Sequence, residues 1–385
     1  MYDGPVIDLD VHHTWNSDSE IIERLPQRWR DHVLGPGNGR RLPIGPAGRG
    51  IQHPGGINKR LETFPLGGGR PGSDYETLRK QLLEDYQIER CVLGFDNALS
   101  AAVGNPHFAN ALVAAVNDWN AETWLSIDDD RLYGCVLVPT QLPEEAAKEI
   151  RRVGHNPKIV AALLTFNGLN RPYGHPLYLP IFEAAQELDL PVVMHATGAE
   201  WSGGVLSMVA GGQGATRLEQ HSLLIEGGIH HVLSLILNGV FERFPRLKFV
   251  AVEAGTAWLP WLAWKLDAHY DVLRRESSWV RKRPSEYLRE HVSVTTQPLE
   301  MSPKPDQLWQ LYEAYGGMEN QLCFATDYPH WDADSPAYIG RRIPEAWHTK
   351  VFHDNALGIY RWDRRTRRTR RTGVPVGAAA EGAGS

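Results

Sequence analysis

The sequence predicts one α/β domain of the (β/α)8 TIM barrel class. Eight short apolar runs alternate with longer segments of helical pattern along most of the 385 residues. The runs are nearly continuous in valine, isoleucine and leucine, as expected for parallel strands that are buried on both faces. They cover residues 6–11, 91–95, 132–139, 160–164, 191–195, 248–253, 291–295 and 322–326.

The intervening segments carry the apolar spacing of helices. They cover residues 75–88, 108–130, 144–153, 177–188, 221–244, 257–275 and 307–315. An open, doubly wound sheet is the alternative, but it usually has a glycine-rich turn after its first strand. Here that position reads Asp10-Val11-His12-His13, which offers metal-ligand or acid–base chemistry and no phosphate-binding turn.

Two segments interrupt the alternation. Residues 34–73 contain 12 glycines and 6 prolines, too many for regular elements, so they form an insertion after strand one. In a barrel this insertion would lie over the active-site mouth as a lid or substrate loop. We therefore assign residues 1–361 to the barrel and residues 362–385 to a disordered basic tail, which carries six arginines against Asp363 and Glu381.

Composition excludes several classes of protein. With 42% hydrophobic and 22% charged residues the chain can bury a large core, and a net charge of −6 argues against a nucleic-acid-coating protein. The sequence shows no signal peptide and no membrane-spanning run. Its three cysteines lie in apolar runs without metal spacing, which is typical of reduced thiols. We expect a soluble, cytoplasmic protein that binds a small molecule, with no nucleic-acid or membrane partner.

Candidate catalytic residues lie where barrel strands end, because the active sites of such barrels form at that rim. Strand one ends with Asp10 and His12, strand five with His195, and strand eight with Asp327. Carboxylates and imidazoles suit one divalent metal ion, with zinc as our first expectation and manganese or iron as alternatives. The metal would activate a water molecule, and Asp327 would ligate the metal and accept the proton of that water.

Four blocks of the sequence carry a family resemblance: VIDLDVHHTW, PVVMHATG, FPRLKFVAVEAG and FATDYPHWD. They resemble the amidohydrolase-related family of metal-dependent barrels, in the branch of aminocarboxymuconate-semialdehyde decarboxylase and the dihydroxybenzoate decarboxylases. The matching blocks run from about residue 6 to residue 360, apart from the insertion. The resemblance implies metal ligation by Asp10, His12, His195 and Asp327. Many relatives end strand six with histidine, whereas this chain has Glu253, which we assign to proton transfer or substrate holding.

Other residues near these strand ends are candidates for the substrate site. An aromatic wall for a planar substrate would consist of Trp15, Phe166, Trp201 and Trp331. His221 follows strand five and could reach the site, and His330 is expected to support Asp327 from behind. Trp258, Trp261 and Trp264 have the spacing of a packed helix face and mark a candidate homodimer interface.

These residues lead to three hypotheses. The leading one is a metal-dependent hydrolase in which metal-activated water attacks a carbonyl-type substrate, with Asp327, Glu253 and His195 as catalytic groups. The alternative is a metal-dependent, non-oxidative decarboxylase (carboxy-lyase) of an aromatic or enoic acid. It needs a cation for the substrate carboxylate, for which Arg40, Arg60 and Arg70 of the insertion are candidates. The third is a barrel that binds a small molecule without turnover.

Overall fold

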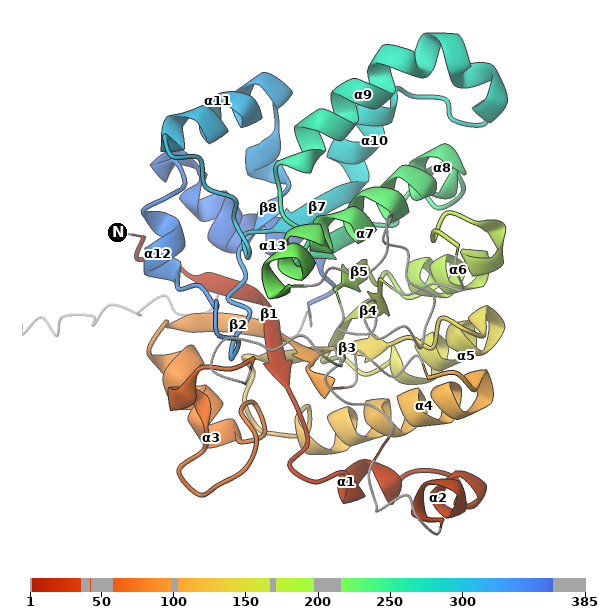
Figure 1. Ribbon diagram of the computed structural model, residues 1–385, viewed down its shortest axis with the longest axis vertical. Coiled ribbons are helices and arrows are strands. Elements are labelled where there is room, and N and C mark those ends of the chain that lie inside the picture. The colour runs from red at the N-terminus through yellow and green to blue at the C-terminus, as the bar shows by residue number, and fades with distance from the viewer. Residues whose placement is uncertain are drawn as a thin grey trace, which may run out of the picture.

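The computed structural model describes residues 2–35, 42, 58–97, 103–166, 171–196 and 216–362. Eight parallel strands, each paired with the next along the chain, form the barrel, which confirms the predicted fold (Figure 1). The strands are β1 (Val6–His13), β2 (Ile88–Phe95), β3 (Leu132–Leu137), β4 (Ile159–Thr165), β5 (Val192–His195), β6 (Phe249–Val252), β7 (Val292–Thr295) and β8 (Leu322–Cys323).

Helices follow the strands and cover the outside of the barrel (Figure 1). They are α1 (Ser19–Ile22), α2 (Gln27–Leu34), α3 (Tyr75–Leu78), α4 (Pro106–Thr123), α5 (Pro143–Val153), α6 (Leu179–Glu187), α7 (Arg217–Leu237), α8 (Val240–Arg243), α9 (Trp258–Leu273), α10 (Pro284–His291), α11 (Pro305–Tyr315), α12 (Pro336–Gly340) and α13 (Asn355–Ile359). The helices that the sequence did not predict, α1, α2, α10, α12 and α13, have at most eight residues each. Such short elements owe their stability to packing rather than to local pattern.

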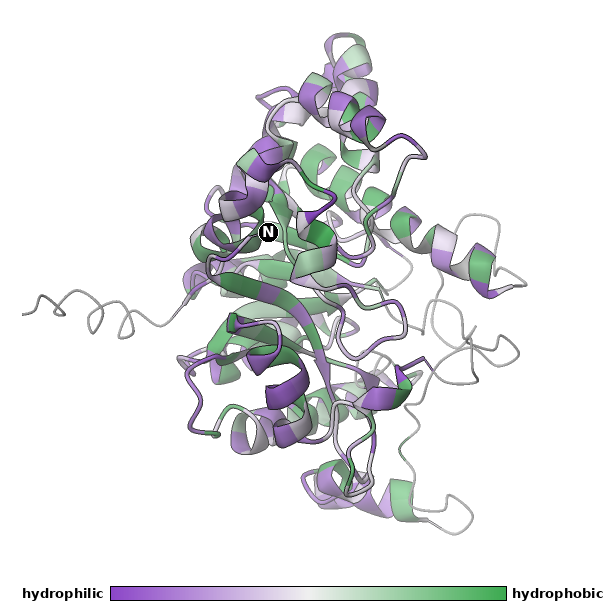
Figure 2. Ribbon diagram, turned by 90° about the vertical axis from the view of Figure 1, so that its left-hand side faces the viewer, coloured by the Kyte–Doolittle hydropathy of each residue, from purple (hydrophilic) through white to green (hydrophobic). Residues whose placement is uncertain are grey.

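The core follows from the apolar strands. Every residue of β1 and of β3 to β8 is buried, and the hydrophobic residues gather on the central strands and the helix faces that cover them (Figure 2). Cys91, Cys135 and Cys323 are buried and unpaired, as predicted. Within the ranges given above, no helix has the length and apolar character needed to span a membrane.

The barrel closes between β8 and β1 through a short seam. The sequence predicted strand eight over residues 322–326, but only Leu322 and Cys323 join the regular ladder. Beyond them three backbone hydrogen bonds cross the seam: Leu9 N to Phe324 O (3.2 Å), Asp327 N to Asp10 O (3.0 Å) and His12 N to Tyr328 O (2.7 Å).

The Asp8 side chain completes this seam. Its Oδ1 accepts from the Thr326 amide at 3.0 Å and from the Asp10 amide at 3.1 Å, and its Oδ2 accepts from the Thr326 hydroxyl at 2.6 Å. The Thr326 hydroxyl in turn accepts from the Tyr328 amide at 3.1 Å. A buried carboxylate with this many donors therefore aligns the two strand ends that carry Asp10 and Asp327.

The two segments outside the alternation are described only in part. In the insertion, Lys59 forms an antiparallel bridge with His330, and the Arg60 amide donates to Pro329 O at 3.1 Å, so residues 58–60 lie along the loop after β8. Residues 36–41, 43–57 and 363–385 lie outside the described residues. Trp362, which the sequence analysis assigned to the tail, is buried and packs edge-on against Tyr133 of β3.

The tryptophans of α9 differ in their exposure. Trp258 is 3% exposed, but Trp261 and Trp264 are 53% and 45% exposed. At about 100° per residue the three positions span roughly 120° of the helix circumference, with Trp258 on the buried side. The homodimer interface stays a prediction.

A test of the seam is Thr326→Val, which keeps the side-chain volume and removes the hydroxyl. The change leaves Asp8 Oδ2 and the Tyr328 amide without their buried partner, so we expect the free energy of unfolding to fall by about 2 kcal/mol. Urea denaturation measures this loss. Thr123→Val, the same change at an exposed position, is the control, and equal losses in the two variants would contradict the assigned role of the seam.

The buried His231 of α7 predicts a loss of stability in acid. Its Nδ1 accepts from the Tyr173 amide at 3.1 Å, its Nε2 donates to Phe166 O at 2.9 Å, and burial lowers its pKa from 6.5 to about 4. Between pH 6.5 and pH 4 the His231 imidazole is therefore protonated in the unfolded chain and neutral in the folded chain. Stability is present above pH 6.5 and is lost as the pH falls, by up to about 3 kcal/mol for this residue.

Urea denaturation between pH 7 and pH 4.5 checks this sign. In His231→Gln the dependence of unfolding free energy on pH should become shallower than in the wild type. His155→Gln, a change at an exposed histidine, should leave it unaltered. An equal pH dependence in His231→Gln and in the wild type would contradict the prediction.

Candidate metal centre

Polar side chains from four strands meet at the carboxyl end of the barrel. Asp10 and His12 lie in β1, His195 ends β5, and Glu253 comes directly after β6. Asp327 follows the short strand β8. All five side chains are buried. The strand ends named by the sequence therefore bring their side chains to one rim.

Three of these residues converge on one point. The Nε2 atom of His195 lies 3.3 Å from Asp10 Oδ2, and the Nε2 atom of His12 lies 3.4 Å from Asp10 Oδ1. One ligand atom from each of the three residues lies within 4.8 Å of the others. The Nδ1 atom of His195 donates to Ala196 O, so its Nε2 lone pair is left to face the cluster.

Asp327 completes the group from the other side of the seam. Its Oδ1 atom lies 3.0 Å from His12 Nε2. The same oxygen lies 2.7 Å from His330 Nδ1. Among the described residues, neither ring nitrogen of His12 has a hydrogen-bond partner of acceptable geometry, although both atoms are buried. Buried polar atoms in native proteins are almost always satisfied by a protein group, an ion or a water molecule. Carboxylate and imidazole donors that face one another in this way fit a divalent cation.

The charges of the cluster favour a cation. Burial alone would raise the pKa of Asp10, but His195 and His12 lower it, so that carboxylate stays ionised. Burial alone would lower the pKa of His195, yet Asp10 raises it to about 9. The imidazole therefore lies in a strongly negative potential, which attracts a metal ion as it attracts a proton.

Glu253 differs from the other carboxyl groups. Its Oε2 atom lies 3.8 Å from His195 Nε2, at the edge of the cluster. Burial, followed by the charge of Asp327, raises its pKa. Glu253 and Asp327 both adopt left-handed backbone conformations, with φ values of 54° and 60°. Such strain in residues other than glycine is concentrated at functional sites.

The predicted aromatic wall is described only in part. Trp15 is buried, donates from its indole to Asp18 Oδ1 at 2.9 Å and packs edge-on against Trp119. Phe166 is also buried and packs beside His231. Trp201 lies outside the described residues. No contact with the cluster is recorded for the two described side chains.

Two predicted residues do meet near the rim. His221 Nε2 lies 3.0 Å from Asp332 Oδ2, and the His221 ring centre lies 6.2 Å from that of Trp331. The hydrogen bond to Asp332 raises the pKa of His221, and the charge of Glu253 adds to the shift. Trp331 is 38% exposed. His221 and Trp331 therefore remain candidates for contacting a substrate.

The candidate arginines of the insertion have partners elsewhere. The Arg60 guanidinium donates to Ala333 O, and that of Arg70 donates to Asp18 Oδ1 at 3.2 Å. Arg40 lies outside the described residues. Among the described residues, Lys59 brings a positive charge toward the cluster, because its Nζ atom donates to Asp96 Oδ1 at 2.6 Å.

The sequence analysis missed Asp96 and Lys59. Asp96 directly follows β2, so the search of strand ends could have found it. Its Oδ1 atom lies 3.4 Å from His330 Nε2, and Asp96, His12 and His330 form a second group that could hold a cation. Lys59 had no such signal, because it lies in an insertion without regular pattern. His330 lies behind Asp327, as predicted, with Nδ1 2.9 Å from Asp327 Oδ2.

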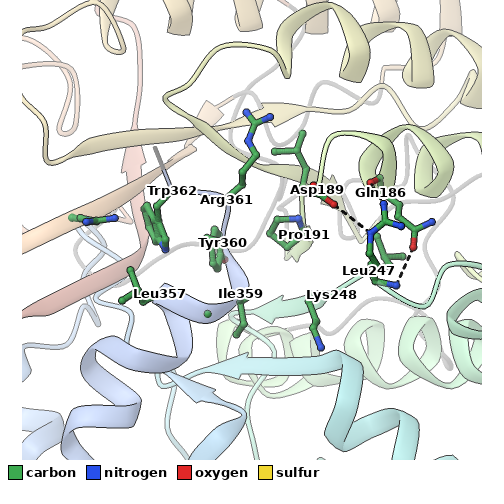
Figure 3. A pocket seen from close by; sticks show the side chains of 14 residues that line it. Gln186, Asp189, Pro191, Leu247, Lys248, Leu357, Ile359, Tyr360, Arg361 and Trp362 are labelled. Carbon is green, nitrogen blue, oxygen red and sulfur yellow. Dashed lines mark hydrogen bonds and ion pairs between the residues drawn. The ribbon is translucent and has the colours of Figure 1, made fainter. Parts of the chain in front are cut away.

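A cavity of about 430 Å³ lies at the other end of the barrel and takes no part in this cluster (Figure 3). It is lined by the starts of β5 and β6 and by residues 357–362. The basic groups on its wall already have partners. Arg361 donates to the carbonyl groups of Gly154, Asn156, Ile159 and Leu188, and Lys248 donates to Glu290 O. The Arg361 contacts attach the C-terminal segment to the barrel.

Comparison with known proteins gives similar sequences and similar folds. The gamma-resorcylate decarboxylase of Polaromonas sp. is 25% identical over 307 residues, which cover 76% of this chain and 89% of that protein. An amidohydrolase of Mycobacterium avium subsp. paratuberculosis has a TM-score of 0.69 at 20% identity, with 93% of this chain and 100% of that chain covered.

A third similar protein is the 5-carboxyvanillate decarboxylase of Novosphingobium aromaticivorans, solved with manganese and a nitrobenzoic acid. Its TM-score is 0.63 at 20% identity, with 92% of this chain and 96% of that chain covered. The amidohydrolase family model matches residues 7–362, nearly the whole described chain. The chain therefore belongs to the amidohydrolase family.

Proposed function

We propose that this protein is a divalent-metal-dependent, non-oxidative decarboxylase of a hydroxylated aromatic acid. The observation that carries the proposal is the relation to the gamma-resorcylate decarboxylases, which extends over 89% of their length. The buried carboxylate–imidazole cluster supports it, because the decarboxylation of such an acid needs an electrophile beside the carboxylate. The comparisons thus favour the decarboxylase over the hydrolase that the sequence analysis placed first.

In this proposal Asp10, His12, His195 and Asp327 hold the metal ion. The bound ion would supply electrophilic polarisation of the substrate carboxylate and the neighbouring phenolic oxygen. Manganese is a better first choice than zinc, since a 5-carboxyvanillate decarboxylase of similar fold contains it.

The protein's own groups would then move one proton. Glu253, a buried carboxyl at the edge of the cluster, donates its proton to the ring carbon that bears the carboxylate. The carbon–carbon bond breaks, its electron pair restores the aromatic ring, and CO2 leaves. Glu253 is left ionised and recovers its proton from solvent. His221 and Trp331, near the rim, would contact the ring of the substrate.

Metal content tests the ligand assignment. Elemental mass spectrometry should find about one equivalent of a divalent metal per wild-type chain. His195→Ala should lose most of it, because one of the converging donors is gone, whereas His155→Ala, at an exposed histidine, should keep it. A wild-type protein that remains metal-free after reconstitution with manganese, zinc and iron would overturn the proposal.

CO2 release distinguishes the two reaction types. The manganese-loaded protein should release CO2 from 2,6-dihydroxybenzoate or 5-carboxyvanillate and should not hydrolyse a panel of amides and lactones. Glu253→Gln should lower kcat at least about 100-fold while the metal content is kept, since a positioned proton donor contributes roughly 10²–10⁴ in rate. Glu345→Gln, at an exposed glutamate, is the control. Hydrolysis without CO2 release would instead support the hydrolase.

A further inference from the structure

A chain of charged side chains runs from the insertion to the proposed metal ligand Asp327. Lys59 Nζ donates to Asp96 Oδ1 at 2.6 Å, and the same oxygen lies 3.4 Å from His330 Nε2. His330 Nδ1 lies 2.9 Å from Asp327 Oδ2. The side chains of Lys59, Asp96, His330 and Asp327 are 10%, 21%, 9% and 0% exposed. Positive and negative groups therefore alternate from the edge of the mouth to its floor.

His330 occupies the central place in this chain because both of its ring nitrogens face carboxylates. Ionised carboxylates only accept hydrogen bonds, so His330 donates from Nδ1 to Asp327 and from Nε2 to Asp96. Two donated bonds on opposite sides fix the rotation of the ring. The ring also stacks on His12, with centres 4.4 Å apart. The orientation of the Asp327 carboxylate thus depends on Asp96.

The Lys59 side chain is positioned by its backbone. Lys59 forms an antiparallel bridge with His330, and the next amide, of Arg60, donates to Pro329 O at 3.1 Å. The Arg60 guanidinium contacts Ala333 O in the same loop. An exposed lysine would lose much of the benefit of an ion pair to side-chain entropy and salt screening. This one is largely buried, and its backbone is paired with the loop that carries His330.

We propose that Lys59 and Asp96 are positioning residues that hold His330, and through it the Asp327 carboxylate, in the orientation that binds the divalent cation. The proposal rests on the metal site of the proposed function and extends it to a segment that the sequence marked only as a loop. Residues behind a metal ligand typically change metal affinity by about 10- to 100-fold when they are altered. Lys59 and Asp96 therefore make metal affinity depend on the docking of residues 58–60.

The test compares Lys59→Met, Asp96→Asn and the double variant. The dissociation constant for Mn²⁺ is measured by competition with a chelator, and the thermal midpoint is measured for each metal-free protein. We expect each single change to weaken Mn²⁺ binding about 10- to 100-fold with little change in the metal-free midpoint. The double variant should be no weaker than the weaker single variant, because both changes break the same chain.

Two further variants exclude a general effect of the substitution. Lys59→Arg keeps the positive charge and should restore most of the Mn²⁺ affinity. Lys80→Met, the same replacement at an exposed lysine, should leave affinity and midpoint unchanged.

Three outcomes would overturn the proposal. One is an unchanged Mn²⁺ affinity, and another is a lowered midpoint of the metal-free protein without a further loss of affinity, which would assign the pair to folding alone. The third is a rise in KM for the aromatic acid at unchanged Mn²⁺ affinity, which would make Lys59 a substrate contact. A wild-type protein that binds Mn²⁺ but releases no CO2 would refute the decarboxylase and leave this test intact. A protein that binds no metal refutes both.

Discussion

The seam between β8 and β1 is the constraint on which the candidate site depends. Asp8 and Thr326, 318 residues apart in the chain, are joined there by two buried hydrogen bonds. Only two residues of β8 join the sheet, so the Asp8 side chain replaces ladder bonds that a longer strand would provide. Asp10 and Asp327 lie next to this pair in the chain. The contacts that close the barrel therefore also bring these two carboxyl groups together.

Closure also concentrates charge that the fold must balance. Several carboxyl groups and three imidazoles are buried at the mouth, where an uncompensated charge is costly. The protein balances them pairwise, Asp10 with His195 and Asp327 with His330. The ring nitrogens of His12, which have no hydrogen-bond partner of acceptable geometry among the described residues, lie beside the position proposed for the cation. The same buried carboxyl groups and imidazoles thus determine the electrostatic potential at the mouth and the proposed chemistry.

The insertion contributes to this balance of buried charges. Its described part pairs with the loop after β8 and places a positive charge beside Asp96. The opposite end of the barrel is organised differently, because the basic groups there bind backbone carbonyls, and Arg361 attaches the C-terminal segment in this way. One rim is therefore built around ionisable side chains and the other around packing, a division common to barrel enzymes.

The sequence by itself determined the eight strands and the rim residues Asp10, His12, His195 and Asp327, because runs of apolar residues and the polar residue that ends each run are local patterns. It did not determine which reaction they serve, since both candidate reactions use such ligands. Only the tertiary structure brought Lys59 and Asp96 to His330. The physical reason is that these contacts join segments as far as 234 residues apart, where no local pattern reports which side chains will meet.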